Sequence, residues 1–270
     1  METAPITFEF VTVERHGAVA VVAFDRHDGI NAMSMQLARE LTATANALYD
    51  DLETHAIVLV GRGKGFCAGR DLRDTEIAAR TAGPMLARRH LGGDGWRLCQ
   101  AWERLEQFTV AAVERFAVGG GLAFALSTDW RVAGQSAHFR APEVALGLSM
   151  SWGSIPRLVN LVGPARAKQI LLMANDGISA DQALAWGLAQ DIAPDGEAEA
   201  RAIQWAQKVA AMPPVAARMT KKTINAYSNA LADLAVHMDT EEVILTEHTA
   251  DHAEAVDAFF QRRPPRFTGG

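Results

Sequence analysis

The chain has 270 residues, of which 49% are hydrophobic and 21% charged, a composition typical of a globular protein with a sizeable core. Its 26 Lys and Arg against 32 Asp and Glu residues give a formal net charge of −6, which argues against a nucleic-acid binder. The two cysteines, Cys67 and Cys99, lack CxxC or metal-ligand spacing, as is typical of a reducing compartment. The sequence shows no signal peptide and no apolar run of about 18 residues, so we expect a cytoplasmic protein without a membrane span.

The first third of the chain predicts strands that alternate with helices. Residues 6–13 and 18–24 predict a hairpin that turns at His16 and Gly17. Ser34 is a suitable N-cap for a helix over residues 35–50.

Two further strands are predicted from apolar runs. The continuous run at 56–60 is typical of a strand buried on both faces, and 110–113 predicts another such strand. Helical patterns dominate beyond Gly119, and a last strand is expected at 189–193.

Local signals also place helix ends in the second half. Ser179 and Gln182 form a capping box for a short helix that Gly187 ends. From residue 197 onward the pattern predicts helices alone, with a break at 212–214. We therefore expect an α/β core over residues 1–196 and a helical region over 197–270.

Two glycine-containing turns follow two of the predicted strands. They are GFCAGRDL at 65–72 and AVGGGL at 117–122, and each is expected to lead into a helix. The first N–H groups of a helix have no partner within it, and glycine allows a ligand to approach closely. Two such turns side by side could aim two N–H groups at one oxygen, as in an oxyanion hole. Either turn alone is more typical of tight packing.

A single carboxylate is the third candidate. Glu143 stands between Pro142 and an apolar stretch, and burial among apolar groups would make it a stronger base. Taken alone, the residue is more typical of an exposed glutamate on a loop.

Together these segments resemble the crotonase superfamily, also called the enoyl-CoA hydratase/isomerase family. The resemblance extends over nearly the whole chain, in order and spacing. It is carried by FCAGRDL (66–72), AVGGGLAFAL (117–126), FRAPEVALGL (139–148), Arg157-Leu158, VGPARA (162–167), SADQALAWG (179–187) and RRPPRFTG (262–269).

The resemblance implies roles for individual residues. The backbone N–H groups of Arg70 and Gly120 would bind the carbonyl oxygen of an acyl-CoA thioester, and Glu143 would be the catalytic acid and base. Other residues implied to line the substrate path are Ala68, Asp71, Leu72, Gly119, Ala123 and Trp152. The fold implied is a crotonase-like spiral of ββα units with a C-terminal helical trimerisation region. The partners implied are an acyl-CoA thioester and copies of the chain, as a homotrimer or hexamer. No cofactor is expected beyond the CoA carried by the substrate.

Two positions depart from the pattern of hydratases in the family. Ala123 replaces a second glutamate, which shifts the expectation from hydration of an enoyl-CoA toward isomerisation of its double bond by one carboxyl group. Trp152 lies where a Pro-Gly-rich turn is usual, and its bulk would reshape the acyl pocket. The alternatives are a hydratase-lyase acting on an aryl or branched acyl-CoA, and an inactive relative that binds a CoA thioester or RNA.

Other side-chain groups give weaker hypotheses. His248 and His252 have i, i+4 spacing, but without an HExxH motif we expect no metal site. Lys221 and Lys222 either face solvent or approach the phosphates of CoA.

Overall fold

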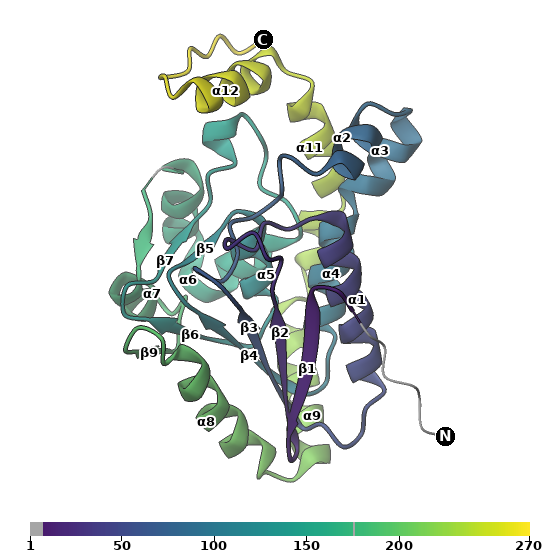
Figure 1. The fold of residues 1–270 in the computed structure, drawn as a ribbon, viewed down its shortest axis with the longest axis vertical. Helices are drawn as coiled ribbons and strands as arrows, with labels where there is room; N and C mark the ends of the chain where they lie inside the picture. The colour runs from purple at the N-terminus through teal and green to yellow at the C-terminus, as the bar shows by residue number, and fades with distance from the viewer. Residues whose placement is uncertain (1–7, 175) are drawn as a thin grey trace.

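The computed structural model describes residues 8–174 and 176–270 (Figure 1). The strands are β1 (Val11–His16), β2 (Val19–Phe24), β3 (Ala56–Gly61), β4 (Phe108–Val113), β5 (Phe116–Val118), β6 (Trp130–Gly134), β7 (His138–Arg140), β8 (Ile178–Ser179) and β9 (Asp191–Ala193). The helices before residue 190 are α1 (Met35–Tyr49), α2 (Thr75–Thr81), α3 (Met85–Gly92), α4 (Asp94–Glu103), α5 (Gly120–Leu126), the 3₁₀ turn η1 (Val144–Leu146), α6 (Ser154–Leu172) and α7 (Ala180–Trp186). Those that follow are α8 (Ala198–Ala210), α9 (Pro214–Ser228), α10 (Ala232–Val236), α11 (Asp239–Glu247) and α12 (Ala250–Gln261).

A six-stranded sheet in the order β1-β2-β3-β4-β6-β9 forms the centre of the molecule. The β1–β2 pair is antiparallel, and every later pair in this sheet is parallel. Parallel strands end at the same edge, so the segments that follow β3 and β4 meet there. A second, three-stranded sheet, β5-β7-β8, continues from that edge.

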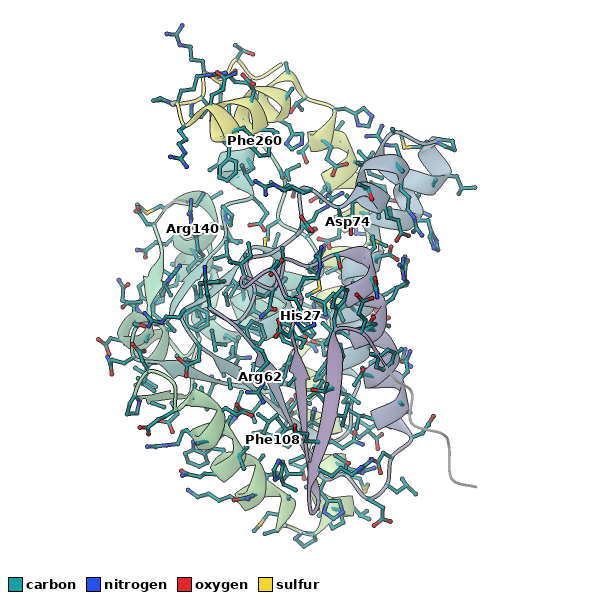
Figure 2. The ribbon with its side chains drawn as sticks, in the orientation of Figure 1. His27, Arg62, Asp74, Phe108, Arg140 and Phe260 are labelled. Atoms are coloured by element: carbon teal, nitrogen blue, oxygen red, sulfur yellow. The ribbon has the colours of Figure 1, made fainter. Side chains whose placement is uncertain are left out.

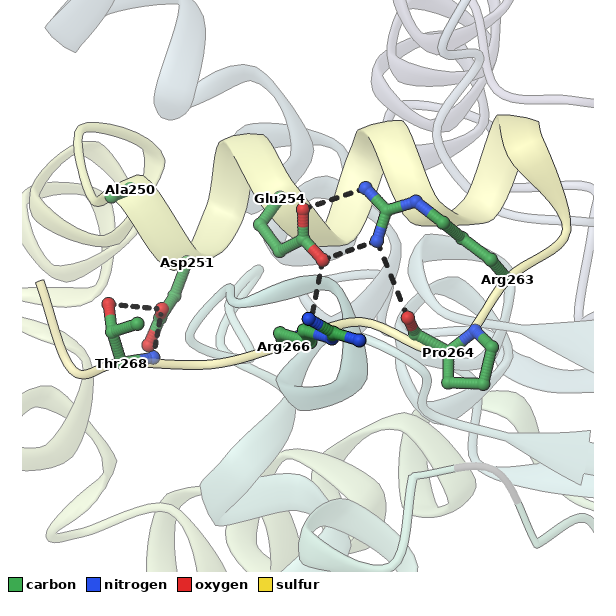
Figure 3. A pocket seen from close by; sticks show the side chains of 7 residues that line it. All are labelled: Ala250, Asp251, Glu254, Arg263, Pro264, Arg266 and Thr268. Carbon is green, nitrogen blue, oxygen red and sulfur yellow. Dashed lines mark hydrogen bonds and ion pairs between the residues drawn. The ribbon is translucent and has the colours of Figure 1, made fainter.

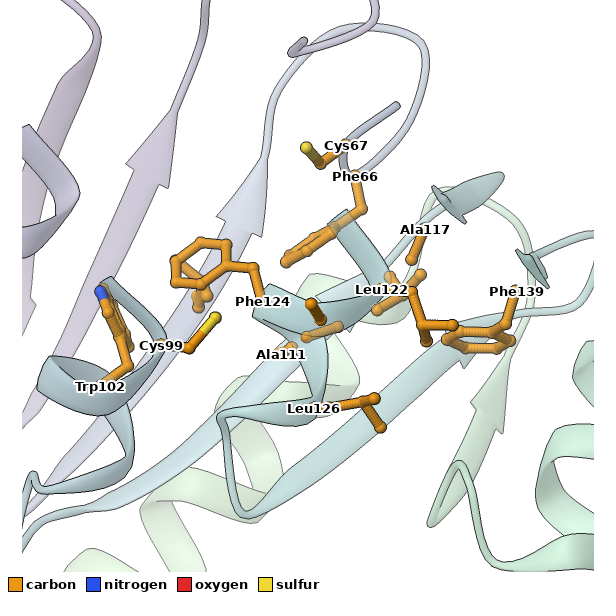
Figure 4. Close-up of a cluster of buried hydrophobic side chains, with 14 of the residues drawn as sticks. Phe66, Cys67, Cys99, Trp102, Ala111, Ala117, Leu122, Phe124, Leu126 and Phe139 are labelled. Carbon is orange, nitrogen blue, oxygen red and sulfur yellow. The ribbon is translucent and has the colours of Figure 1, made fainter. Parts of the chain in front are cut away.

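The sheet is covered on both faces, which explains the continuous apolar runs. Alternate residues of β2, β3 and β4 face α8 through its small side chains Ala198, Ala202 and Ala206. The opposite face packs against α1, α4 and α5 in the main core. In that core Phe124 makes an edge-on contact with Trp102 and lies near Phe66, as Figure 4 shows.

The strongest local predictions are confirmed. β1 and β2 form the hairpin, with Gly17 at a φ of +63°. Ser34 accepts the N–H of Leu37 at the start of α1. The Ser179–Gln182 capping box is present.

The helix ends in the second half follow the prediction as well. Gly187 ends α7 in the left-handed conformation. From residue 197 onward the described chain forms helices and no strand, with a break between α8 and α9 at 211–213.

Some predicted boundaries are wrong. The first strand, expected at 6–13, begins at Val11 and ends at His16; residues 6 and 7 lie outside the described residues. The prediction of helices beyond Gly119 misses β6 and β7, because strands of three to five residues show too few alternations to reveal a period of two.

The division into 1–196 and 197–270 stays a prediction. α8, just beyond that boundary, packs on the central sheet, whereas α12 lies at the far end of the molecule (Figure 1). Figure 2 shows Asp74 and Arg140 in the half nearer to α12, and Phe108 in the opposite half.

Candidate active site

The first glycine turn, residues 65–72, does not open a helix, contrary to the prediction. α2 begins only at Thr75, where the Asp74 carboxylate accepts two backbone N–H groups as the N-cap. Asp71 instead pairs with Arg26 at 3.0 Å. The N–H groups of this turn are therefore not those of a helix start.

An extended bridge holds the end of this turn. The N–H of Met33 donates to the carbonyl of Gly69 at 2.7 Å, and the N–H of Asp71 donates to the carbonyl of Met33 at 3.0 Å. Between them, the N–H of Arg70 has no acceptor among residues 8–174 and 176–270. Because the residues on either side of Arg70 pair with Met33 as in a β-bridge, the turn presents one unpaired amide, that of Arg70.

The second turn opens a helix, as predicted. Gly119 has a φ of +54° and donates its N–H to the carbonyl of Arg140 at 2.8 Å. Gly120 is the first residue of α5, a position whose N–H has no partner within the helix. In the described part of the chain this N–H has no other acceptor.

The two turns lie against each other. Cys67 bridges Ala117, and the N–H of Val118 donates to the carbonyl of Cys67 at 3.0 Å. A Cβ atom built on Gly69 would lie 2.8 Å from the oxygen of Val118 and 3.3 Å from the nitrogen of Gly120. These contacts place the two turns side by side, and the binding of one oxygen by both amides stays a prediction.

Glu143 lies directly beside the second turn. A Cβ atom built on Gly119 would be 2.7 Å from its Oε1, and its Oε2 is buried with no hydrogen-bond partner among the described residues. The residue as a whole is half-buried, so it is the carboxyl end that is shielded from water. This burial raises the pKa of Glu143 to about 7, although its own backbone N–H and the charge of Arg140 act in the opposite direction.

Trp152 covers the glycine next to the one that Glu143 contacts. A Cβ atom built on Gly120 would be 2.6 Å from its Cη2, and one built on Gly95 of α4 would be 2.0 Å from its Cε2. The indole ring therefore lies between the backbones of α4 and α5. Ala123, one turn further along α5, is fully buried in the main core.

The remaining residues of the predicted substrate path lie along the first turn. Ala68 is half-buried and donates its N–H to the carbonyl of Ile30 at 3.0 Å. Leu72 is 52% exposed, as expected of a residue at the mouth of a site. The Arg70 side chain pairs with Glu247 of α11 at 2.8 Å.

The site also contains contacts that the sequence did not predict. Asp239 of α11 accepts the N–H of Gly153 at 2.9 Å, and Arg157 donates to the carbonyl of Trp152 at 2.7 Å. Gly95 was not predicted either, because no helix was predicted around it; a glycine inside a helix such as α4 is a signal of close packing.

The two histidines on the C-terminal helices make other contacts. His248 contacts Arg88 and the carbonyl of Ile244, and His252 contacts the carbonyl of Leu146. The described residues include no group of three or more His, Cys, Asp or Glu placed to hold a metal ion. None of the helices in these residues has both the length and the hydropathy to cross a bilayer.

The two lysines differ in their surroundings. Lys221 pairs with Asp129 at 2.7 Å and donates to the carbonyl of Gln107, so it faces the protein. Lys222 is exposed and pairs with Glu106. A contact with CoA phosphates stays a prediction.

A cavity of about 620 Å³ lies between α12 and the C-terminal tail, and Glu143 is not one of the residues that line it (Figure 3). Its charged groups bind one another: Arg263 pairs with Glu254, and Asp251 accepts the N–H groups of Thr268 and Gly269. These groups are paired, whereas Oε2 of Glu143 has no partner among the described residues, so Glu143 is the stronger candidate for the chemistry, and its catalytic role stays a prediction.

The fold and the site together define a crotonase-like α/β protein. The enoyl-CoA hydratase/isomerase family profile matches residues 14–270, and the chain belongs to this family. It is therefore an enzyme of the enoyl-CoA hydratase/isomerase type, as the resemblance implied.

Individual relatives cover almost the full length. A short-chain-enoyl-CoA hydratase of Clostridium acetobutylicum is 34% identical over 94% of this chain and 95% of that protein. A 1,2-epoxyphenylacetyl-CoA isomerase of Escherichia coli is 28% identical over 97% of this chain and 99% of that protein. The crystal structure of an enoyl-CoA hydratase from Mycobacterium avium subsp. paratuberculosis K-10 is similar with a TM-score of 0.85 and 26% identity, covering 97% of this chain and 100% of that chain.

Proposed function

We propose that the protein isomerises the double bond of an enoyl-CoA, with Glu143 as the only catalytic carboxyl group. The observation that carries the proposal is the carboxyl group of Glu143. Its buried Oε2 has no partner in the described chain, and its Oε1 lies beside Gly119, the glycine that precedes the unpaired amide of Gly120. A buried and unpaired carboxyl group is costly to folding and is found mainly where chemistry requires it.

The reaction follows from these groups. The N–H groups of Arg70 and Gly120 bind the thioester oxygen and stabilise the negative charge that forms on it. Glu143 takes a proton from the α carbon; the C–H bond breaks, and its electron pair enters the enolate. The protonated carboxyl then returns the proton to the γ carbon, which moves the double bond and restores the carboxylate. One group acts as base and then as acid, for which a pKa near 7 is suitable.

Hydration is the second candidate, favoured by the similarity to the hydratase of Clostridium acetobutylicum. It needs a second polar group to position water, and Ala123 offers only a methyl group in the core. Ser149 is a poor substitute, because its hydroxyl donates to Glu242 at 3.2 Å. These contacts support isomerisation over hydration.

The test is to assay the wild type and Glu143→Gln with 2-enoyl-CoA and 3-enoyl-CoA thioesters and to identify the products. We expect the wild type to interconvert the two and Glu143→Gln to lose about 10²–10⁴-fold in kcat, the usual contribution of a general base. Glu40→Gln is the matched control, because Glu40 is also buried but accepts the N–H of Phe10 at 2.8 Å. It should retain full turnover.

Each alternative has its own result in this assay. A 3-hydroxyacyl-CoA product would assign hydration, and cleavage of an aryl or branched 3-hydroxyacyl chain would assign a hydratase-lyase. Full activity of Glu143→Gln would refute the proposed base. Binding of acyl-CoA or RNA without turnover of any thioester would point to an inactive relative.

We further propose that the enzyme acts as a homotrimer or a dimer of trimers in the cytoplasm and needs no cofactor besides the CoA of its substrate. Support for assembly comes from large apolar side chains exposed on α9 and α12. They are Val215, Met219, Ile224, Tyr227, Phe259 and Phe260. The mass in solution, against 29.1 kDa for one chain, tests the assembly.

A further inference from the structure

Trp152 has a backbone conformation that bulky residues rarely adopt. Its φ is +62°, in the left-handed region. Arg157 Nη1 donates to its carbonyl at 2.7 Å, and the Asp239 carboxylate accepts the N–H of Gly153 at 2.9 Å as well as the N–H of Trp152 itself. Such a conformation persists only where the surroundings over-determine it, and it is common at ligand sites.

Asp239 is placed to fix this turn from a distant part of the chain. It is the first residue of α11 and is 6% exposed. Burial raises its pKa to about 6, and the N–H groups of Gly153 and Trp152 act in the opposite direction by stabilising the carboxylate. In a setting with little water, hydrogen bonds to a charged carboxylate are stronger than those between neutral groups.

Arg157 is itself fixed. Its Nε and Nη2 bind the two oxygens of Glu103 at 2.9 and 2.8 Å, so its remaining nitrogen reaches the carbonyl of Trp152 from a set direction. The peptide group between Trp152 and Gly153 is thus held from both ends, its carbonyl by Arg157 of α6 and its N–H by Asp239 of α11.

The result of this fixation is the position of the indole ring. Its six-membered ring rests on Gly120, whose amide is unpaired, and its other edge rests on Gly95. Glu143 rests on Gly119, the preceding residue. The indole ring and the carboxyl group therefore contact two consecutive glycines, Gly120 and Gly119. An acyl chain that enters beside Gly120 meets the indole.

We propose that Asp239 is a positioning residue that holds Trp152 against Gly120, so that the indole ring restricts the enzyme to compact acyl groups. This inference rests on the proposed function, because it requires the thioester oxygen to bind at Gly120. The selected substrates are short, unbranched enoyl-CoA thioesters, and a phenyl or long alkyl substituent would overlap the ring.

The test is the ratio of kcat/KM for a phenyl-bearing enoyl-CoA to that for a four-carbon enoyl-CoA. Asp239→Ala should raise this ratio at least about tenfold, since pocket size changes of a few carbons have effects of this order. Asp239→Asn should keep the wild-type ratio, because its carbonyl oxygen still accepts the N–H of Gly153. Glu241→Ala, on the same helix but paired with Arg89 at the surface, is the matched control and should keep the ratio.

A double variant separates positioning from general damage to the fold. Trp152→Ala should raise the ratio, and adding Asp239→Ala to it should produce no further rise, because the ring through which Asp239 acts is gone. If Asp239→Ala fails to fold, Trp152→Phe gives the same test with the hydrogen bonds of Asp239 intact, and it should also raise the ratio.

The outcomes distinguish this inference from the proposed function on which it rests. An active enzyme whose ratio is unchanged in Asp239→Ala, or in Trp152→Phe, would overturn the positioning role and leave isomerisation in place. Independent, multiplying effects of Asp239→Ala and Trp152→Ala would overturn it too. A wild type inactive on every thioester, with the same product-free result for Glu143→Gln, would overturn both proposals.

Discussion

The two glycine turns of the site present the same group, an unpaired amide, by different means. At the first turn a Cβ atom built on Gly69 meets backbone, the oxygen of Val118 at 2.8 Å. At the second, a Cβ atom on Gly120 meets the side chain of Trp152 at 2.6 Å. The backbone of Val118 in a packed sheet cannot move aside, whereas a substitution can remove the side chain of Trp152. The difference shows that the first turn depends on the fold itself and the second on one neighbouring residue.

Gly69→Ala should have the largest effect on stability. Its φ of +92° is strained for any residue with a Cβ, and the new methyl group overlaps the backbone of the second turn. We expect the free energy of unfolding to fall by roughly 4 kcal/mol, the sum of typical costs for strain and overpacking. Urea unfolding measures it, and a loss below about 1 kcal/mol would show that the first turn can adapt after all.

The next largest effect on stability concerns Glu143, which contacts Gly119 of the second turn. Its pKa, raised from an ordinary 4.5 to about 7, means that the folded protein binds a proton more tightly than the unfolded chain does. The stability that this group contributes is therefore present below pH 4.5 and is lost as the pH rises through 7, by up to about 3 kcal/mol.

Glu143→Gln should remove this dependence. The free energy of unfolding of the variant, relative to the wild type, should rise between pH 4.5 and 7.5. Denaturant unfolding at a series of pH values measures the difference, with Glu40→Gln as the reference variant. A difference that stays flat across this range would mean that the carboxyl is hydrated in solution.

Gly120→Ala should have the smallest effect on stability. Alanine suits the first turn of a helix, and the three atoms nearest to its new methyl group belong to the Trp152 ring. We expect a loss of about 1 kcal/mol in the free energy of unfolding, at the low end for overpacking.

The same change made in Trp152→Ala should cost nothing, because the overlapping ring is absent. Urea unfolding of the two single variants and the double variant gives the coupling between the two sites. Equal costs in both backgrounds would remove the distinction between the two turns.

Much of the fold could be predicted because its signals are local. β2, β3 and β4 are buried on both faces, which leaves uninterrupted apolar runs, and Ser34 binds an N–H three residues away. β7 could not be found in this way, because three residues carry no visible period. The first turn was misread for a related reason: its partner, Met33, lies outside the motif.

The sequence by itself determined the family, the two turns and the single glutamate, since motif order and residue type are properties of the chain alone. Only the tertiary structure decided that Oε2 of Glu143 is buried without a partner in the described part of the chain and that Trp152 lies on Gly120. The same holds for Asp239, which binds Gly153 across 86 residues. Contacts between such distant residues depend on how the whole chain packs, and no local pattern of side chains records them.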